Sequence, residues 1–403
     1  MDTGRQYKIF ISAAEPSADA HCAGLINALR KTGLDIEFAG LGGIKMQAAG
    51  CSLIENTASG AVMGAAAFGH IGRYIKLINK AKKYIKNNKI DLVVVCDSPS
   101  FNFHIAKAAK EAGIGTLFYV APQLWAWGGW RIGKLRKYCD KLCCILPFEQ
   151  DWFSRRGIDA TFVGNPLLDE AGGNLRTNIK DFRDFKLVVS LPNPSQNARL
   201  AILPGSRAAE IETLWPAMQQ IAIRLKQKYE GITFNAVAVD EKGLAILKSR
   251  QLSGFDCDYS IGNVMEAARR ADFAIVASGS ATLQVAAAGC PMVIMYQSSK
   301  LLWHLAGKFI IKTKYLSLVN ILADKELVPE FMPYFTSIEP VVKAIELLLE
   351  DKESIAETSG ELVRLAEPMV GNAAEKVGKI VIEKIKSQNP VGGAKKINAV
   401  HNK

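Results

Sequence analysis

Residues 200–207 read LAILPGSR, and a helical segment that contains Glu210 follows them. The apolar run indicates a buried strand, and the Pro-Gly pair indicates a tight turn that leads into the N-terminus of the helix. Free backbone N–H groups and the helix dipole favour an anion there, and Arg207 can add a bidentate contact to phosphate. The same residues also fit a plain strand-to-helix turn that Ser206 caps, with Arg207 in solvent.

A second turn of the same kind follows residues 273–276, which read FAIV. The next residues, ASGSAT (277–282), open a helix with small side chains, so a ligand can approach the backbone closely. A diphosphate joined to a nucleoside would occupy both turns. The alternative is that the small residues only let the helix pack closely on a sheet.

Short apolar runs alternate with segments of helical periodicity along most of the chain. Because the runs lack polar alternation, they predict parallel strands that helices cover on both faces. The expected strands are residues 8–12, 36–38, 92–96, 116–120, 142–146 and 160–163, and then 200–203, 233–239, 273–276 and 292–295. The predicted fold class is α/β, with two doubly wound Rossmann-like domains that face a cleft. In such sheets ligands bind beyond the carboxyl ends of the strands.

The chain length predicts two domains, because 403 residues exceed what one hydrophobic core usually serves. The mostly polar segment 174–197 is interpreted as the connection between them. We therefore expect an N-terminal domain over residues 1–190 and a C-terminal domain over 198–350. Helices within 351–386, with a break near Pro368, are expected to pack back toward the N-terminal domain, and 387–403 to form a disordered tail.

The composition narrows the function classes. Fifty Lys and Arg against 39 Asp and Glu give a net charge of +11, which suits an anionic partner such as a phosphate, a nucleotide or an acidic membrane surface. The 49% hydrophobic content excludes disorder throughout, and no nucleic-acid-binding module has a recognisable signature.

The N-terminus lacks the apolar core of a signal peptide. Polar residues interrupt the uncharged stretch 273–299, so it is not expected to span a membrane. Eight scattered cysteines predict reduced thiols in a cytoplasm, and the histidines show no metal-ligand pair.

Carboxylates follow two of the expected strands in the first half of the chain. Asp97 comes directly after strand 92–96, and Glu15, Ser17 and Asp19 follow the first strand. Opposite a sugar hydroxyl, Asp97 would serve as a general base, and the two other carboxylates would bind hydroxyls. Each acidic residue fits equally well as the start or the cap of the helix that follows it.

Two segments of the first half suit an amphiphilic partner. Residues 119–131 hold three of the six tryptophans, which predicts a groove for apolar chains or sugars. The expected helix 74–88 is basic and amphipathic, so it is either a solvated face or a surface that rests on anionic lipid headgroups. The basic residues in and beside it are Arg73, Lys76, Lys80, Lys82, Lys83 and Lys86.

Many of these segments together resemble the lipid-A-disaccharide synthase family, inverting glycosyltransferases of the two-domain GT-B type. The resemblance extends to about Lys386, and its motifs are AEPSAD (14–19), GLGG (40–43), DSPSFN (97–102), YVAPQLWAW (119–127), LPFE (146–149), FVGNPL (162–167), LPGSR (203–207), ASGSAT (277–282), SLVN (317–320) and VPE (328–330). It implies transfer from UDP-2,3-diacylglucosamine to 2,3-diacylglucosamine 1-phosphate, which yields the β-1,6-linked lipid A disaccharide phosphate and UDP. It also implies no metal or other cofactor and a peripheral location on the inner face of the inner membrane, and it leaves a homodimer open.

The resemblance also implies roles for single residues. Asp97 is the expected base that deprotonates the 6-hydroxyl of the acceptor. The nucleotide and donor site is expected to contain Gly205, Ser206, Arg207, Ser278, Gly279, Ser280, Thr282, Gln284, Met295, Tyr296, Asn320 and Glu330. The acceptor and lipid groove is expected to contain Glu15, Ser17, Asp19, Asn102, Gln123, Trp125 and Trp127.

The sequence departs from the family pattern at five positions. Ala18 replaces a glycine, Ser100 an aspartate, Asn165 a histidine, Gln284 a glutamate expected on the ribose hydroxyls, and Pro333 a glutamine. A Gln at position 284 can accept a hydrogen bond but lacks a charge, which bears on nucleotide affinity. Two alternatives therefore stay open: a UDP-sugar 2-epimerase-like enzyme, and a nucleotide- or lipid-binding paralogue without catalysis.

Overall fold

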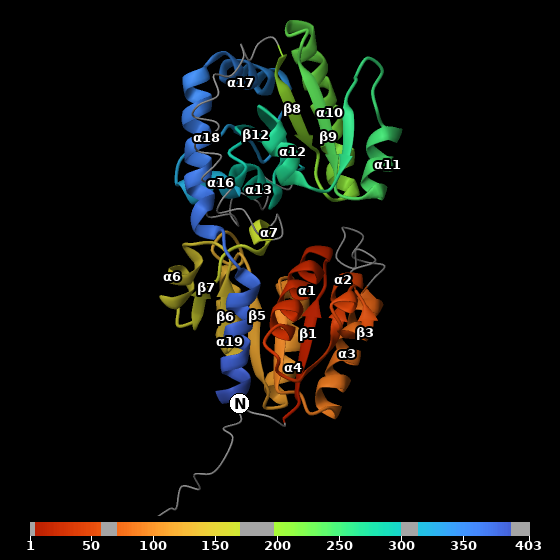
Figure 1. Ribbon diagram of the computed structural model, residues 1–403, viewed down its shortest axis with the longest axis vertical. Coiled ribbons are helices and arrows are strands. Elements are labelled where there is room, and N and C mark those ends of the chain that lie inside the picture. The colour runs from red at the N-terminus through yellow and green to blue at the C-terminus, as the bar shows by residue number, and fades with distance from the viewer. Residues whose placement is uncertain (1–4, 58–70, 170–196, 300–312, 388–403) are drawn as a thin grey trace, which may run out of the picture. The chain divides into compact units, whose positions relative to one another are not determined.

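The computed structural model describes residues 5–57, 71–169, 197–299 and 313–387 (Figure 1). The chain divides into two compact units. The first consists of Met1–Pro122, Trp130–Val163 and Asn372–Lys403, and the second of Gln123–Gly129 and Gly164–Gly371. The segments 170–196 and 388–403, which include most of the expected connection and the expected tail, lie outside the described residues.

The first unit contains a parallel sheet of seven strands in the order β3-β2-β1-β4-β5-β6-β7. Its strands are β1 (Tyr7–Ala13), β2 (Ile36–Gly42), β3 (Ser52–Asn56), β4 (Leu92–Cys96), β5 (Gly115–Tyr119), β6 (Lys141–Cys144) and β7 (Ala160–Phe162). Its helices are α1 (Pro16–Arg30), α2 (Ile44–Ala48), α3 (Ile71–Asn87), α4 (Pro99–Glu111), α5 (Ile132–Tyr138), α6 (Glu149–Ser154) and α19 (Ala373–Ser387), and η2 (Gly129–Arg131) precedes α5. The strand order reverses between β1 and β4, which places the ends of these two strands side by side.

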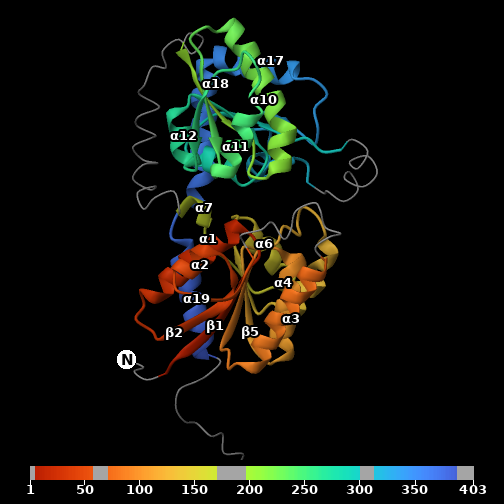
Figure 2. The ribbon, with the colours of Figure 1, turned by 90° about the vertical axis from the view of Figure 1, so that its right-hand side faces the viewer.

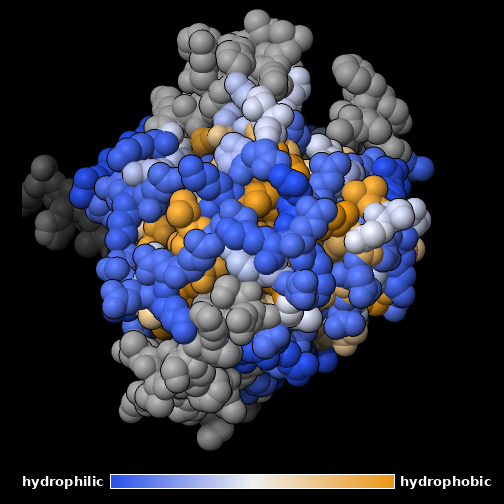
Figure 3. Space-filling model, turned by 90° about the horizontal axis from the view of Figure 1, so that it is seen from above, coloured by the Kyte–Doolittle hydropathy of each residue, from blue (hydrophilic) through white to orange (hydrophobic). Residues whose placement is uncertain are grey.

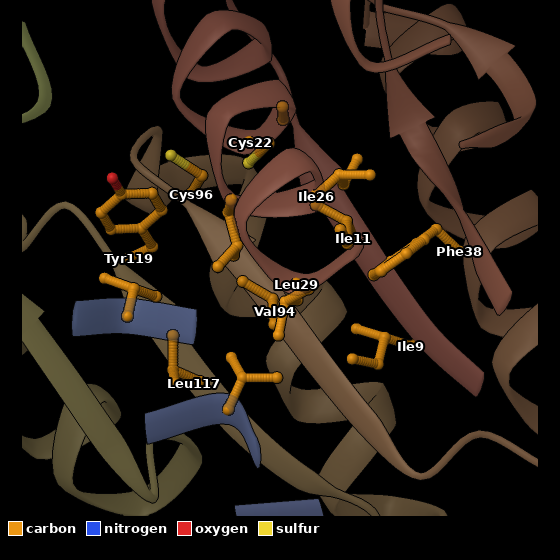
Figure 4. Close-up of a cluster of buried hydrophobic side chains, with 14 of the residues drawn as sticks. Ile9, Ile11, Cys22, Ile26, Leu29, Phe38, Val94, Cys96, Leu117 and Tyr119 are labelled. Atoms are coloured by element: carbon orange, nitrogen blue, oxygen red, sulfur yellow. The ribbon is translucent and has the colours of Figure 1, made fainter. Parts of the chain in front are cut away.

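Helices cover both faces of this sheet. Figure 2 shows α1 and α19 on one face and α3 and α4 on the other. β4 is fully buried, as its uninterrupted apolar sequence requires. In Figure 4, side chains of the sheet lie against those of α1; the labelled residues are Ile9, Ile11, Val94, Cys96, Leu117 and Tyr119 from the sheet, Cys22, Ile26 and Leu29 from α1, and Phe38. The C-terminal helix α19 adds Val377, Val381 and Ile385 to the same core.

The second unit contains a parallel sheet of six strands in the order β10-β9-β8-β11-β12-β13. Its strands are β8 (Arg199–Leu203), β9 (Thr233–Ala238), β10 (Asp258–Ile261), β11 (Phe273–Ala277), β12 (Met292–Met295) and β13 (Glu330–Phe331). Its helical segments are α7 (Pro166–Asp169), α10 (Ala208–Lys228), α11 (Glu241–Ser249), α12 (Val264–Arg270), α13 (Ala281–Ala287), α16 (Leu318–Ala323), α17 (Glu339–Glu350), α18 (Lys352–Ala366) and η4 (Glu367–Met369). Here the order reverses between β8 and β11, so the two turns that the sequence singled out follow neighbouring strands.

The predicted fold class is confirmed, whereas three strands and one helix assignment differ from expectation. β3, β10 and β13 lie at sheet edges, and their mixed polar sequences lack the apolar run that marks the central strands. Of the C-terminal helices, only α19 packs on the first unit, against α1; α18 packs on α13 in the second. The second unit takes up Gln123–Gly129 and then the chain from Gly164 onward, whereas the expected boundary lay after residue 190.

Surface and core follow the usual division of side chains. The face of the molecule shown in Figure 3 is mainly hydrophilic, with apolar side chains scattered among the charged ones, as on most folded domains. Within the described ranges, no helix has both the length and the apolar character that crossing a bilayer requires.

Candidate active site

The turn after β8 depends on a glycine. Gly205 has φ +112°, a backbone conformation that residues with a Cβ rarely adopt. A Cβ added at this position would lie 2.8 Å from Glu210 Oε2 and 2.9 Å from Glu210 Cβ. The turn is therefore built so that the backbone passes directly beneath the side chain of Glu210.

A carboxylate already occupies the N-terminus of α10. Glu210 Oε2 accepts hydrogen bonds from the backbone N–H of Ser206 (3.1 Å) and Arg207 (3.3 Å). Its Oε1 pairs with the Arg207 guanidinium at 3.0 Å. Arg207, not Ser206, is the N-cap residue, and its side chain is 69% exposed. The turn therefore presents an exposed guanidinium that is paired with Glu210.

The turn after β11 lies beside the first turn and is open. A Cβ added to Gly205 would lie 3.6 Å from Ala277 Cβ, so the backbones of the two turns are close neighbours. Gly279 and Ser280 are exposed, and a Cβ added to Gly279 would meet nothing within 4 Å. The buried Thr282 stabilises the turn through a 2.7 Å hydrogen bond from Oγ1 to the Gly279 carbonyl. The paired turns could bind two phosphate groups of one ligand.

The residues around the second turn differ in what they expose. Ser278 donates its N–H to the Met295 carbonyl at 2.8 Å, which joins the ends of β11 and β12. Met295 itself is fully buried, whereas Tyr296 is 36% exposed and Gln284 is partly exposed on α13. Tyr296 and Gln284 therefore have side-chain surface that a nucleoside could contact.

Asn320 and Glu330 contact each other and neighbouring backbone. Asn320 is fully buried; its Nδ2 donates to the Val328 carbonyl (2.9 Å) and to Glu330 Oε2 (3.0 Å). Glu330 also accepts the backbone N–H groups of Leu316 (2.9 Å) and Ser317 (3.0 Å). The structure gives both residues a role in holding the loop before β13, a role that the sequence did not indicate.

In the first unit, Asp97 lies at the carboxyl end of β4 in a strained turn. Asp97 and Ser98 have φ +51° and +42°, and non-glycine residues seldom adopt such values. Asn102 is fully buried on α4 and donates to the carbonyls of Asp97 (2.7 Å) and Cys96 (2.9 Å). Its Oδ1 accepts the Ser12 hydroxyl at 2.8 Å, so β1 supports the turn as well. Strain held by surrounding contacts is common at functional sites.

The three polar residues after β1 have different environments. Glu15 accepts a 3.3 Å hydrogen bond from the Ser98 hydroxyl, which brings the ends of β1 and β4 together. Ser17 is exposed. Asp19 is buried and accepts the backbone N–H groups of Gly43 (2.7 Å), Lys45 (3.1 Å) and Met46 (3.0 Å), so it caps α2. The structure thus joins Glu15 to the Asp97 turn and gives Asp19 the capping role.

The tryptophan-rich segment is partly buried. Trp125 is only 8% exposed, whereas Trp127 is 45% exposed and Gln123 is exposed. These three residues belong to the second unit, whereas Trp130, at 74% exposure, belongs to the first. Only the exposed indoles offer surface for an apolar chain.

The five departures from the family pattern occupy dissimilar places. Ala18 is fully buried in α1, Ser100 is exposed on α4, and the Pro333 carbonyl accepts the Ser298 N–H at 2.9 Å. Asn165 is fully buried in the turn before α7, where its Oδ1 accepts the Leu167 N–H at 3.1 Å. Gln284 is the one of the five that belongs to the helix opened by the second turn.

The cysteines are thiols rather than disulfides. The eight cysteines are free, and burial raises the pKa of Cys51 and of Cys139 to about 12, so both stay protonated at neutral pH. No group of three or more His, Cys, Asp or Glu side chains is arranged for a metal ion within the part of the chain that the structure describes.

Two carboxylates hold local structure that the sequence motifs do not indicate. Glu210 fills the β8 turn, and the fully buried Glu149 accepts the N–H groups of Ile145 and Leu146 at 3.1 Å each. The signal for Glu210 is its position, three residues after the N-cap, which is the position of the glutamate in a capping box.

The architecture matches the solved structures of an epimerase and of a glycosyltransferase. A structure titled UDP-GlcNAc 2-epimerase from Neisseria meningitidis bound to UDP-GlcNAc aligns with a TM-score of 0.60 at 11% identity, covering 94% of this chain and all of that one. The calicheamicin glycosyltransferase CalG4 aligns with a TM-score of 0.57 at 13% identity, over 96% of this chain and 100% of the other. The fold is therefore that of the GT-B class, with two Rossmann-like domains.

Sequence comparison narrows this class to one family. The family model described as Lipid-A-disaccharide synthetase matches residues 9–383. Lipid-A-disaccharide synthase of Geobacter metallireducens is 31% identical over 95% of this chain and 98% of its own length. Lipid-A-disaccharide synthase 1 of Legionella pneumophila (strain Philadelphia 1) is 33% identical over 91% and 94%. The chain belongs to the lipid-A-disaccharide synthetase family, whose members are glycosyltransferases.

Proposed function

We propose that this protein joins UDP-2,3-diacylglucosamine to 2,3-diacylglucosamine 1-phosphate, forming the β-1,6-linked lipid A disaccharide 1-phosphate and UDP. The observation that carries the proposal is the pair of adjacent turns after β8 and β11, with the exposed Arg207 guanidinium on one and the exposed Gly279 and Ser280 on the other. Family membership over nearly the whole chain supports the choice of reaction.

In the proposed mechanism, Asp97 accepts the proton of the acceptor 6-hydroxyl. The acceptor oxygen then attacks the anomeric carbon of the donor, forming the new glycosidic bond with inversion as the bond to the UDP oxygen breaks. Arg207 and the N–H groups of the two turns stabilise the negative charge that develops on the departing diphosphate. The proposal includes no cofactor.

The reaction is tested by incubating the protein with both acylated substrates and measuring UDP and disaccharide. We expect equal amounts of the two products, and no UDP when the acceptor is omitted. An epimerised sugar nucleotide formed without acceptor would instead support the 2-epimerase alternative. UDP binding with no product under any condition, together with turnover gained on Gln284→Glu, would support a paralogue that has lost catalysis.

We also propose that an anionic membrane surface is the partner of the first unit, which would place the protein at the inner face of the inner membrane. Burial lowers the pKa of His104, and the positive charges of Lys82, Lys134 and Lys107 lower it further. These lysines come from α3, α5 and α4, so their charges converge near His104. Two apolar side chains on or next to the same helices are also exposed: Ile75 is 51% exposed on α3, and Trp130 is 74% exposed shortly before α5. Cationic side chains together with exposed apolar ones suit anionic headgroups above acyl chains.

Binding to phosphatidylglycerol-containing vesicles should therefore be strong at low salt and largely lost at about 0.5 M salt, because screening shortens the reach of these charges. The double variant Lys82→Gln/Lys134→Gln should bind more weakly than the native protein in a vesicle sedimentation assay. Lys242→Gln/Lys343→Gln removes the same charge from exposed positions in the second unit and should bind like the native protein. Equal binding at low and high salt would contradict docking by this face.

A further inference from the structure

The two turns of the proposed nucleotide site differ in whether a side chain of the protein already fills them. Around the turn after β11, a Cβ added to Gly279 would meet no atom within 4 Å. At the turn after β8, the carboxylate of Glu210 accepts two backbone N–H groups and pairs with Arg207. These are the same donors that a phosphate would use there, because both ligands are anions that accept from N–H groups at a helix N-terminus.

The contact between Glu210 and the turn is part of the local fold. The Glu210 side chain is only 22% exposed, and the positive φ of Gly205 lets the backbone pass within contact distance of it. A side chain held in this way is ordered before any ligand arrives. The carboxylate therefore imposes a negative charge on a site that must receive another one.

We infer that Glu210 competes with the donor diphosphate for the turn after β8 and so sets the affinity of the site for phosphate groups. A phosphate that binds Ser206 N–H and the Arg207 guanidinium must displace the carboxylate or accept its repulsion. Either way, part of the binding energy is lost. The inference rests on the proposed function, since it concerns the same UDP site.

Such a competitor would favour turnover over tight product binding. UDP alone would have to displace Glu210, whereas the complete donor has further contacts through its sugar and acyl chains. The carboxylate returns to its three donors as UDP leaves, so the site does not retain the product. Glu210 would thus be a positioning residue that acts through Arg207 and the turn, without touching the reacting atoms.

The test compares Glu210→Gln with Glu212→Gln by isothermal titration calorimetry. Both substitutions remove one negative charge from α10, and both glutamates pair with an arginine, but Glu212 pairs with Arg250 at 2.7 Å, not with the turn. Glu210→Gln should bind UDP about tenfold more tightly than the native protein, about 1.4 kcal/mol. Its affinity for uridine, which has no phosphate, should be unchanged, and Glu212→Gln should match the native protein with both ligands.

The ratio of UDP to uridine affinity separates this role from a structural one. If Glu210 only caps the helix, the substitution lowers the melting temperature and leaves that ratio unchanged or lowers it, which overturns the inference. Inorganic pyrophosphate is the third probe. If UDP binds neither protein but pyrophosphate binds Glu210→Gln more tightly, the proposed function fails, whereas competition between Glu210 and phosphate groups for this turn is supported. The inference is overturned if the native protein and Glu210→Gln bind UDP with equal affinity and also bind pyrophosphate with equal affinity.

Discussion

Asp97→Asn should lower the turnover number with both acylated substrates by about 10²- to 10⁴-fold, the usual contribution of a general base. The amide has nearly the shape of the carboxylate but cannot accept the proton of the acceptor hydroxyl. Asparagine tolerates positive φ better than most residues, so the turn at φ +51° and its hydrogen bonds to Asn102 should remain intact. Steady-state kinetics at saturating donor and acceptor measure the effect.

The control for this variant is its affinity for UDP. Both nucleotide turns belong to the second unit, whereas Asp97 belongs to the first, so the UDP dissociation constant should equal that of the native protein. The melting temperature should also change little. A variant with native turnover would remove Asp97 from the mechanism, and one that lost UDP binding would indicate a structural defect instead.

Arg207→Ala should weaken UDP binding by about 10²-fold, because a charge-assisted hydrogen bond contributes about 1.5–3 kcal/mol. The substitution removes an exposed guanidinium and leaves Glu210 without its cationic partner, so the site becomes more negative as well. Arg207→Lys should recover only part of the affinity, since an ammonium group cannot form the bidentate contact. Calorimetric titration with UDP measures all three proteins.

Arg250→Ala is the matched control, because Arg250 pairs with Glu212 of the same helix and not with the turn. It should bind UDP like the native protein. The double variant Arg207→Ala/Glu210→Gln should bind UDP more tightly than Arg207→Ala alone, because the unpaired carboxylate is then absent. Native UDP affinity in Arg207→Ala would place the diphosphate elsewhere.

Much of the fold was predictable from local sequence. The strand that became β4 was assigned with its observed bounds because five apolar residues buried on both faces have no polar alternation. The break near Pro368 is present as η4, followed by α19. β10 and β13 were missed because strands at a sheet edge are stabilised by a single neighbour and part of their surface stays in water, which their polar sequences reflect.

Site residues could be predicted from the sequence where the backbone geometry requires one residue type. They could not be predicted where a side chain's role depends on which distant group it hydrogen-bonds. The Pro-Gly pair predicts a turn at Gly205, and the structure confirms the turn, with a positive φ and with Glu210 lying close to where a Cβ would be. Asp19 and Asn320 belong to motifs of the family, yet the structure shows them bound to backbone groups that lie 24 to 27 and 7 to 8 residues away. Spacing along the chain does not reveal such contacts.

The position of α19 determines when the core of the first unit can be completed during synthesis. Val377, Val381 and Ile385 complete a core that is otherwise built from the first half of the sequence, after the chain has formed all of the second unit. During synthesis from the N-terminus, the part of this face that α19 covers beside α1 therefore stays exposed until α19 has left the ribosome. The unit that carries Asp97 is translated first, but it gains the α19 part of its core only after residues 164–371 of the second unit have been made.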